Sequence, residues 1–148
     1  MSYTYKDNTD EVLSALEKAI GNGLTTIGMT AEGHAKEEIT KLVYSRGNNE
    51  KKYRLTGRLR NSITFAISGE KAAISSYKDD DGNVYTYDET APKDKEKAVY
   101  IGTNVEYAPY VELGTSKMPA RPFLKPAATE HKDEYKKIME AAMKSVEP

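Results

Sequence analysis

The chain has 148 residues, of which 30% are charged and 38% hydrophobic, and its formal net charge at pH 7 is -1. This length suits one domain with a modest core, and the balanced charge provides no overall basic field for nucleic acid. There is no cysteine, which excludes disulfides and thiolate metal sites. No apolar run has the length of a membrane span, and the polar N-terminus lacks the apolar segment of a secretory signal.

The first predicted element is a long helix that follows a flexible arm over residues 1–8. Asn8 and Glu11 have the spacing of a capping box, and Gly47 is suited to a C-terminal cap. Gly21-Asn22-Gly23 predicts a kink or a loosened turn in the helix. The length of the helix predicts that it wraps a sheet or projects toward a neighbouring subunit. One apolar stripe recurs at steps of three and four positions, formed by Leu13, Leu16, Ile20, Leu24, Ile27, Ala31, Ala35, Ile39 and Leu42.

The next segment is a loop over residues 47–55, followed by a short helical turn or the lead into a strand. One interpretation of its basic residues is a patch that binds DNA phosphates or an acidic partner. The other is that they are solvated and pair with nearby carboxylates, which the slightly acidic chain favours. These basic residues are Lys51, Lys52, Arg54, Arg58 and Arg60.

From Ile63 the apolar period changes to two, which predicts a strand over 63–67, a turn, and a return strand over 72–76. Residues 79–96 are mostly polar and predict an extended loop or hairpin, and a further strand is expected over 98–101. The fold class is therefore α+β, with a small antiparallel sheet of three or four strands packed by the N-terminal helix and a C-terminal helix.

The acidic residues of segment 79–96 do not have the spacing of an EF-hand calcium loop, so no calcium site is expected. We expect this segment to order against a partner protein. Its candidate partner contacts are Asp80, Asp81, Tyr85 and Tyr87, to which Arg58 and Arg60 are added from the basic segment.

Residues 99–128 are the densest apolar stretch of the chain. A short helix is predicted from Tyr107 to Leu113, with Pro109 in its first turn and Gly114 closing it. Two prolines hold Arg121 on a rigid extended segment, where its guanidinium suits a bidentate carboxylate.

Glu112 is the predicted partner of Arg121, as an ion pair that ties this loop to the short helix. A final helix is predicted from Pro126 to the end of the chain. It places His131 on its packing face or flank, and His34 lies at the edge of the N-terminal apolar stripe.

Two blocks of this sequence, Thr56 to Ile63 and Gly102 to Ala127, together resemble the head–tail joining proteins of long-tailed bacteriophages. These are also called tail completion or minor head–tail connector proteins. The likeness covers roughly residues 10–145. The residues that carry it are Gly57, Arg58, Leu59, Tyr107, Pro109, Tyr110, Glu112, Gly114, Thr115, Arg121, Pro122, Phe123 and Pro126.

The resemblance implies an α+β virion protein, made in the host bacterial cytoplasm, that completes the tail end and joins it to the DNA-filled head. It implies a ring of this chain, with six subunits expected from tail symmetry. The expected neighbours are head-closure, terminator or tail-tube proteins, and the ring is able to contact DNA in the channel. The alternatives are a tail terminator that caps the tail tube, a nucleic-acid-binding accessory protein, and a cellular protein derived from a prophage remnant.

No motif for a nucleophile with its base, a metal triad or a phosphate-binding loop is present. Glu112 is the only carboxylate in an apolar context, and the two histidines fall in two different predicted helices. We therefore expect no enzymatic activity, no catalytic residue, no cofactor and no metal.

Overall fold

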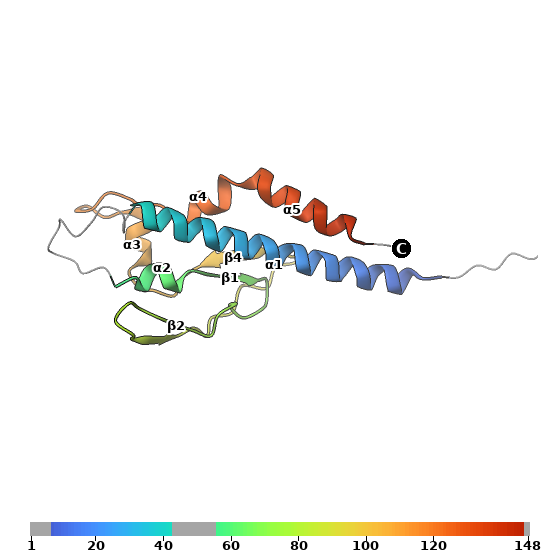
Figure 1. Cartoon of the computed structure of the whole chain (residues 1–148), viewed down its shortest axis with the longest axis horizontal. Helices are drawn as coiled ribbons and strands as arrows, with labels where there is room; N and C mark the ends of the chain where they lie inside the picture. Colours follow the sequence, from blue (N-terminus) through green and yellow to red (C-terminus); the bar gives the residue numbers. More distant parts are fainter. Residues whose placement is uncertain (1–6, 43–55, 147–148) are drawn as a thin grey trace, which may run out of the picture.

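The computed structural model describes residues 7–42 and 56–146, which form an α+β fold around one long helix (Figure 1). The predicted class is confirmed, because a long N-terminal helix and C-terminal helices pack on a small set of antiparallel strands. The elements are α1 (Thr9–Leu42), α2 (Arg58–Ser62), β1 (Thr64–Ile67), β2 (Ser76–Lys78), β3 (Val84–Thr86), β4 (Val99–Gly102), α3 (Ala108–Leu113), α4 (Leu124–Thr129) and α5 (Lys132–Lys144).

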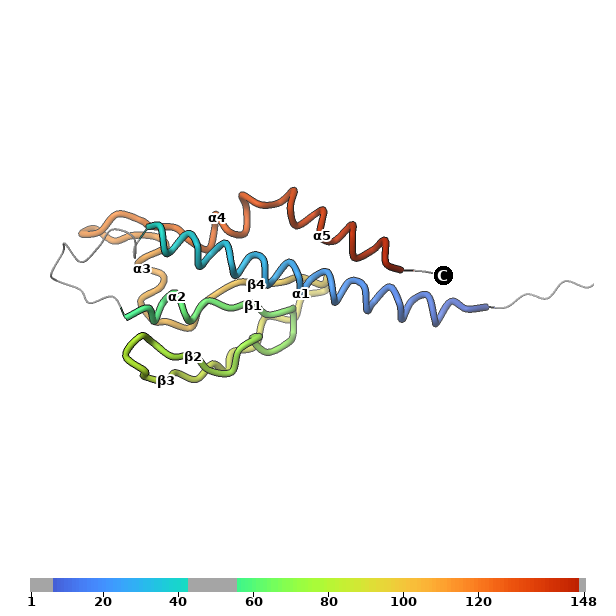
Figure 2. The backbone as a smooth tube through the Cα atoms, in the orientation of Figure 1, coloured from blue at the N-terminus to red at the C-terminus, as the bar shows by residue number. Residues whose placement is uncertain are grey.

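Helix α1 is continuous over 34 residues, which corresponds to about 51 Å at the usual rise per residue. The backbone N–H of Thr9 donates to the Asp7 carboxylate at 2.9 Å, so Asp7 caps the first turn. The helix contacts α4 and α5 as well as β1 and β4. Figure 2 shows the C-terminal helices on one side of α1 and the strands on the other. Residues 1–6 of the predicted arm over 1–8 and the cap at Gly47 lie outside the described residues.

The predicted kink or loosened turn at Gly21-Asn22-Gly23 does not interrupt α1, which is one helix through these residues. Gly23 is buried, and a Cβ atom there would lie 2.8 Å from Met139 Sδ of α5. A Cβ atom at Gly28 would lie closer still to the ring of Phe65 in β1. These two glycines let α5 and β1 approach the helix, and this close packing offsets the helix propensity that they lack.

The strands form two separate two-stranded sheets, so the prediction of one sheet with three or four strands is wrong. Strand β1 pairs antiparallel with β4, and Thr64 lies opposite Gly102. Strand β2 pairs antiparallel with β3, and Tyr77 lies opposite Tyr85.

The predicted hairpin between 63–67 and 72–76 does not form a strand ladder, because β1 pairs with β4 along its whole length. Ala73 N still donates to Phe65 O of β1 at 2.9 Å, but Ala72 N donates to Glu89 O at 3.1 Å, and Ser75 O accepts from Tyr87 N at 2.8 Å. Segment 79–96 therefore begins with the turn and return strand of the β2–β3 hairpin and then runs beside residues 69–75.

The short helix predicted from Tyr107 to Leu113 is confirmed as α3, with proline in its first turn. The predicted single C-terminal helix is interrupted, because the backbone at His131 has φ -120° and ψ 27° and leaves the helical region. The hydroxyl of Tyr135 in α5 donates to the carbonyl of Ala127 in α4 across this turn. The break lets the chain bend so that α5 lies along α1.

The core lies where α1, α2, α3 and α4 meet the β2–β3 hairpin. Its largest fully buried side chains are Phe123, Ile39 and Ile63. The full cluster of buried residues is Ala35, Ile39, Leu59, Ile63, Tyr77, Val105, Ala108, Phe123 and Ala127. Among the described helices, none is both long and apolar enough to cross a lipid bilayer.

Candidate functional site

The two sequence blocks meet at the end of the molecule that carries α2 and α3 (Figure 1). Arg58, in the first block, forms a bidentate pair with Glu106, in the second. Arg58 Nη1 lies 3.1 Å from Glu106 Oε1, and Arg58 Nη2 lies 3.0 Å from Glu106 Oε2. Two parallel bonds between a guanidinium and a carboxylate fix direction as well as distance. This pair joins segments that are 48 positions apart in the sequence.

Aromatic rings surround the Arg58 guanidinium. Its central carbon lies 4.2 Å from the ring centroid of Tyr85 and 5.8 Å from that of Tyr107. The pKa of Glu106 is lowered, first by its own backbone N–H and then by Arg58. Glu106 therefore remains ionised at neutral pH, and Arg58 is held by a carboxylate and two aromatic faces of its own chain.

Gly57 positions this arginine at the start of α2. Its φ is 74°, in the left-handed region that favours glycine, and a Cβ there would lie 2.7 Å from the Asp80 carboxylate. The backbone N–H of Asp80 donates to Thr56 O at 2.6 Å, and Arg60 Nη2 lies 3.9 Å from Asp80 Oδ1. Both arginines predicted as partner contacts thus have acidic partners within the chain. The other basic residues of that segment lie outside the described ranges.

The predicted acidic loop is organised by Asp79, which is buried. Its carboxylate accepts hydrogen bonds from the backbone N–H of Asp81 at 3.0 Å and of Asn83 at 2.9 Å. The Asn83 amide and the Tyr85 hydroxyl donate to it at 2.9 Å and 3.2 Å. The Asn83 side chain is the main cause that lowers the pKa of Asp79, against the effect of burial. This carboxylate therefore stabilises the turn between β2 and β3.

The two tyrosines predicted as partner contacts pack within the chain. Tyr85 stacks on Tyr77 with ring centroids 5.3 Å apart, and Tyr87 meets the same ring edge-on at 6.3 Å. Burial raises the pKa of Tyr87 to about 12. Asp80 and Asp81 are exposed beside them. The role of these four residues as partner contacts remains a prediction.

Glu112 joins α3 to α4, but by different atoms from those predicted. Its carboxylate accepts backbone hydrogen bonds from Phe123 at 2.8 Å, Leu124 at 3.0 Å and Lys125 at 3.0 Å. These N–H groups open α4 and have no partner within the helix, so a carboxylate satisfies both their hydrogen bonds and the helix dipole. The predicted ion pair with Arg121 is therefore wrong.

Arg121 is held through its backbone. Its N–H donates to Val111 O at 2.8 Å, and its side-chain Nε is buried without a hydrogen-bond partner among residues 7–42 and 56–146. The backbone N–H groups that follow Pro122 are better placed for Glu112. A link between the short helix and the loop that follows it was predicted correctly. Its donors, however, are main-chain N–H groups, which no pattern of side chains identifies.

Replacing Glu112 by alanine is expected to lower the free energy of unfolding by about 2 kcal/mol, because three N–H groups at the start of α4 lose a charged acceptor. Urea denaturation measures the change. Glu96→Ala is the matched control, since Glu96 is exposed, and it should change stability by less than about 0.5 kcal/mol. A double-mutant cycle with Arg121→Ala should give little coupling. Strong coupling would instead indicate an ion pair between Glu112 and Arg121.

Sequence reasoning missed Glu106 and a second polar link between the blocks. The Ser62 and Thr103 hydroxyls lie 2.5 Å apart. Tyr77 donates to the side chain of Asn104 at 2.8 Å, which in turn donates to Thr86 O at 3.0 Å. Their only sequence signal is position, since Thr103, Asn104 and Glu106 all fall inside the second block.

Helix α3 leaves one apolar face in solvent. The residues of this face are three positions apart, starting at the N-cap residue Tyr107, and the exposed fractions are 38% for Tyr107, 60% for Tyr110 and 77% for Leu113. Residues at this spacing share one side of a helix. Large apolar side chains gathered on one exposed face are typical of surfaces that contact another protein.

Comparisons of the chain with known protein families, with curated protein sequences and with solved structures found no match.

Proposed function

We propose that this protein is a structural component of the neck of a long-tailed bacteriophage. A ring of its copies, six by tail symmetry, completes the end of the tail and joins it to the DNA-filled head. The resemblance of the two sequence blocks to head–tail joining proteins supports this assignment. The protein would be made in the host cytoplasm and act in the virion.

The observation that carries the proposal is that the two blocks form one structural unit. Arg58 binds Glu106 across them, and Glu112 fixes the start of α4. Residues that carry the resemblance therefore hold the two blocks together in this chain. This is expected if the two blocks derive from one ancestral domain.

The exposed α3 face is the surface that we assign to contact between copies of this chain. Tyr110 and Leu113 are its most exposed members. Helix α1 offers a second surface, because its first turns extend beyond α5 and the strands (Figure 2) and leave Val12 and Leu13 37% and 50% exposed. A closed ring needs two different surfaces on each subunit, and these two lie toward opposite ends of the molecule.

The neighbouring rings in this proposal are head-closure, terminator or tail-tube proteins. Contact with DNA would come from residues that line the channel. Arg58 and Arg60 are poorly suited to it, because Glu106 and Asp80 already engage them. This pairing favours the neck assignment over a nucleic-acid-binding accessory protein.

The double substitution Tyr110→Ser with Leu113→Ser is expected to prevent ring formation without unfolding the protein, since both side chains are exposed. Size-exclusion chromatography with light scattering would measure the mass of the assembly, for the protein alone and mixed with neighbouring neck proteins. Met29→Ser is the control, because Met29 is 62% exposed on α1 and away from α3. Rings that form equally well in the double variant would remove α3 from the interface.

The function itself is tested by stopping the gene early in the phage or prophage that carries it and examining lysates by electron microscopy. Filled heads beside free tails of normal length are expected. Tails of irregular length would assign the protein as the terminator instead. Normal infectious particles would contradict a role in the neck.

A further inference from the structure

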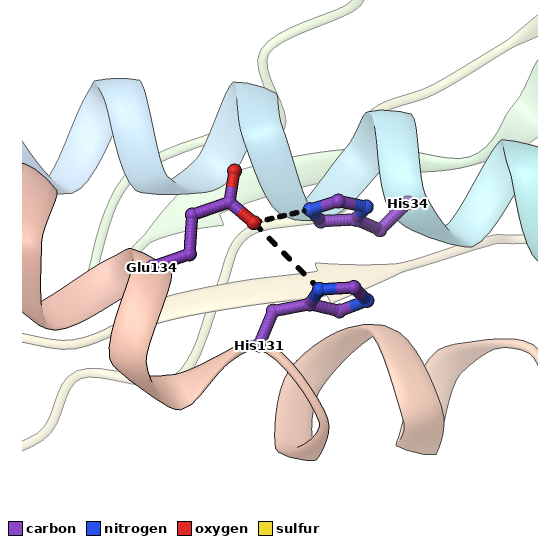
Figure 3. A group of neighbouring side chains, drawn as sticks. All are labelled: His34, His131 and Glu134. Carbon is purple, nitrogen blue, oxygen red and sulfur yellow. Dashed lines mark hydrogen bonds and ion pairs between the residues drawn. The ribbon is translucent and has the colours of Figure 1, made fainter.

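A cluster of three side chains joins the two longest helices. His34 comes from α1, His131 is the residue before α5, and Glu134 lies in the first turn of α5 (Figure 3). Glu134 Oε2 lies 2.9 Å from His34 Nε2 and 3.6 Å from His131 Nδ1. We call these residues the helix-bridging cluster. His34 and Glu134 are 100 positions apart in the sequence.

The cluster has the donor set of a transition-metal site. One ligand atom from each of its three residues lies within 4.8 Å of the other two. Ligand atoms around a tetrahedral zinc ion are separated by about 3.4 Å, as zinc–nitrogen bonds of about 2.05 Å require. Two imidazole nitrogens and a carboxylate oxygen are ligands that zinc accepts, with water in the remaining position.

The cluster is open to solvent, so an ion can reach it. The exposed side-chain fractions are 20% for His34, 30% for His131 and 47% for Glu134. The ring atoms that would not bind, His34 Nδ1 and His131 Nε2, can carry the proton of each neutral imidazole.

The two imidazole rings must tilt for an ion to bind both. Their centroids are 3.6 Å apart and their planes differ by 4°, so the rings are stacked. A nitrogen lone pair lies in the plane of its ring, and no ion can lie in two parallel planes at once. Rotation of the two rings out of this stack would let both lone pairs converge on one ion beside the Glu134 carboxylate oxygen, which already contacts a nitrogen of each ring (Figure 3).

We propose that the helix-bridging cluster binds one zinc ion through His34 Nε2, His131 Nδ1 and a carboxylate oxygen of Glu134. The ion would fix the start of α5 to the C-terminal half of α1. This site is independent of the proposed role in the neck, because its ligands lie on the α1–α5 contact and not on α3.

Calorimetric titration of the untagged full chain with Zn²⁺ tests the proposal, and the tag must be absent because it would supply further histidines. One ion per chain is expected. Zinc at about one hundred times its dissociation constant should raise the melting temperature by roughly 5 °C or more. The imidazole NMR signals of both histidines should shift together, and they are easily assigned because the chain has two histidines.

His34→Gln and His131→Gln each remove one ligand and should weaken zinc binding by more than the roughly 10–100-fold that loss of a supporting residue costs. Glu134→Gln should also weaken it. Glu140→Gln is the matched control, since Glu140 is an exposed carboxylate on the same helix, and it should bind zinc as the parent chain does.

Equal zinc affinity in the parent chain and the histidine variants would overturn the proposal. An unchanged melting temperature of the parent chain in millimolar zinc would also overturn it. Circular dichroism shows whether each variant is folded. If one histidine variant fails to fold, the other and Glu134→Gln carry the test, because each removes a different ligand. None of these readouts depends on ring formation or on phage assembly.

Discussion

Replacing Gly114 by alanine is expected to lower the free energy of unfolding by about 2–4 kcal/mol, since a side chain is strained there for two reasons. Gly114 ends α3 with φ 77° and ψ 173°, a region occupied almost only by glycine. A Cβ would also lie 2.6 Å from Ala120 N and 3.0 Å from Met118 O. These are backbone atoms, so the loop after α3 would have to move.

Urea denaturation and thermal melting measure the effect of Gly114→Ala, and the melting temperature should fall by roughly 10 °C. Gly33→Ala is the matched control. Gly33 lies inside α1 with nothing within 4 Å of its Cβ position, so alanine should be neutral there or stabilise the helix by up to about 1 kcal/mol. The same substitution thus has opposite signs at two sites. A neutral Gly114→Ala would mean that the exit from α3 is not built as described.

Replacing Phe123 by alanine is expected to lower the free energy of unfolding by about 3–5 kcal/mol. Phe123 is 0% exposed and is the largest fully buried side chain in the described part of the chain. Its removal would leave a cavity in the core cluster, because the surrounding side chains cannot close completely. In a protein of this size, a loss of that order can remove much of the native stability.

Tyrosine fluorescence reports this unfolding, because the chain has 11 tyrosines and no tryptophan. Phe123→Leu keeps most of the volume and should cost less than about 1.5 kcal/mol, so it provides a measurement if Phe123→Ala does not fold. Leu113→Ala is the control, since Leu113 is 77% exposed. A loss below about 1 kcal/mol for Phe123→Ala would contradict its position at the centre of the core.

Local patterns were sufficient for the helices that carry strong signals. The apolar stripe predicted α1, and a proline followed five positions later by a glycine predicted α3. The same reasoning failed at Gly21-Asn22-Gly23, because helix propensity cannot reveal that Gly23 lies against Met139. The His131 break was also missed, since the residues on both sides keep a helical pattern.

Strand pairing could not be obtained from the sequence. Two strands close together in the chain favour a hairpin, but β1 pairs with β4, more than thirty positions later. Such short strands carry too little pattern to specify a partner. Prediction of the site from the sequence failed for the same reason. The contacts of Arg58 with Glu106 and of His34 with His131 join segments that are distant in the chain.

The packing of α5 along α1 has a consequence for how the polypeptide folds during synthesis. The face of α1 that α5 covers leaves the ribosome about one hundred residues before α5 does. This face therefore stays uncovered until α5 has been synthesised. Contacts of such large sequence separation form late, and uncovered apolar faces favour aggregation. A nascent chain arrested before residue 132 should therefore engage chaperones that a complete chain no longer needs.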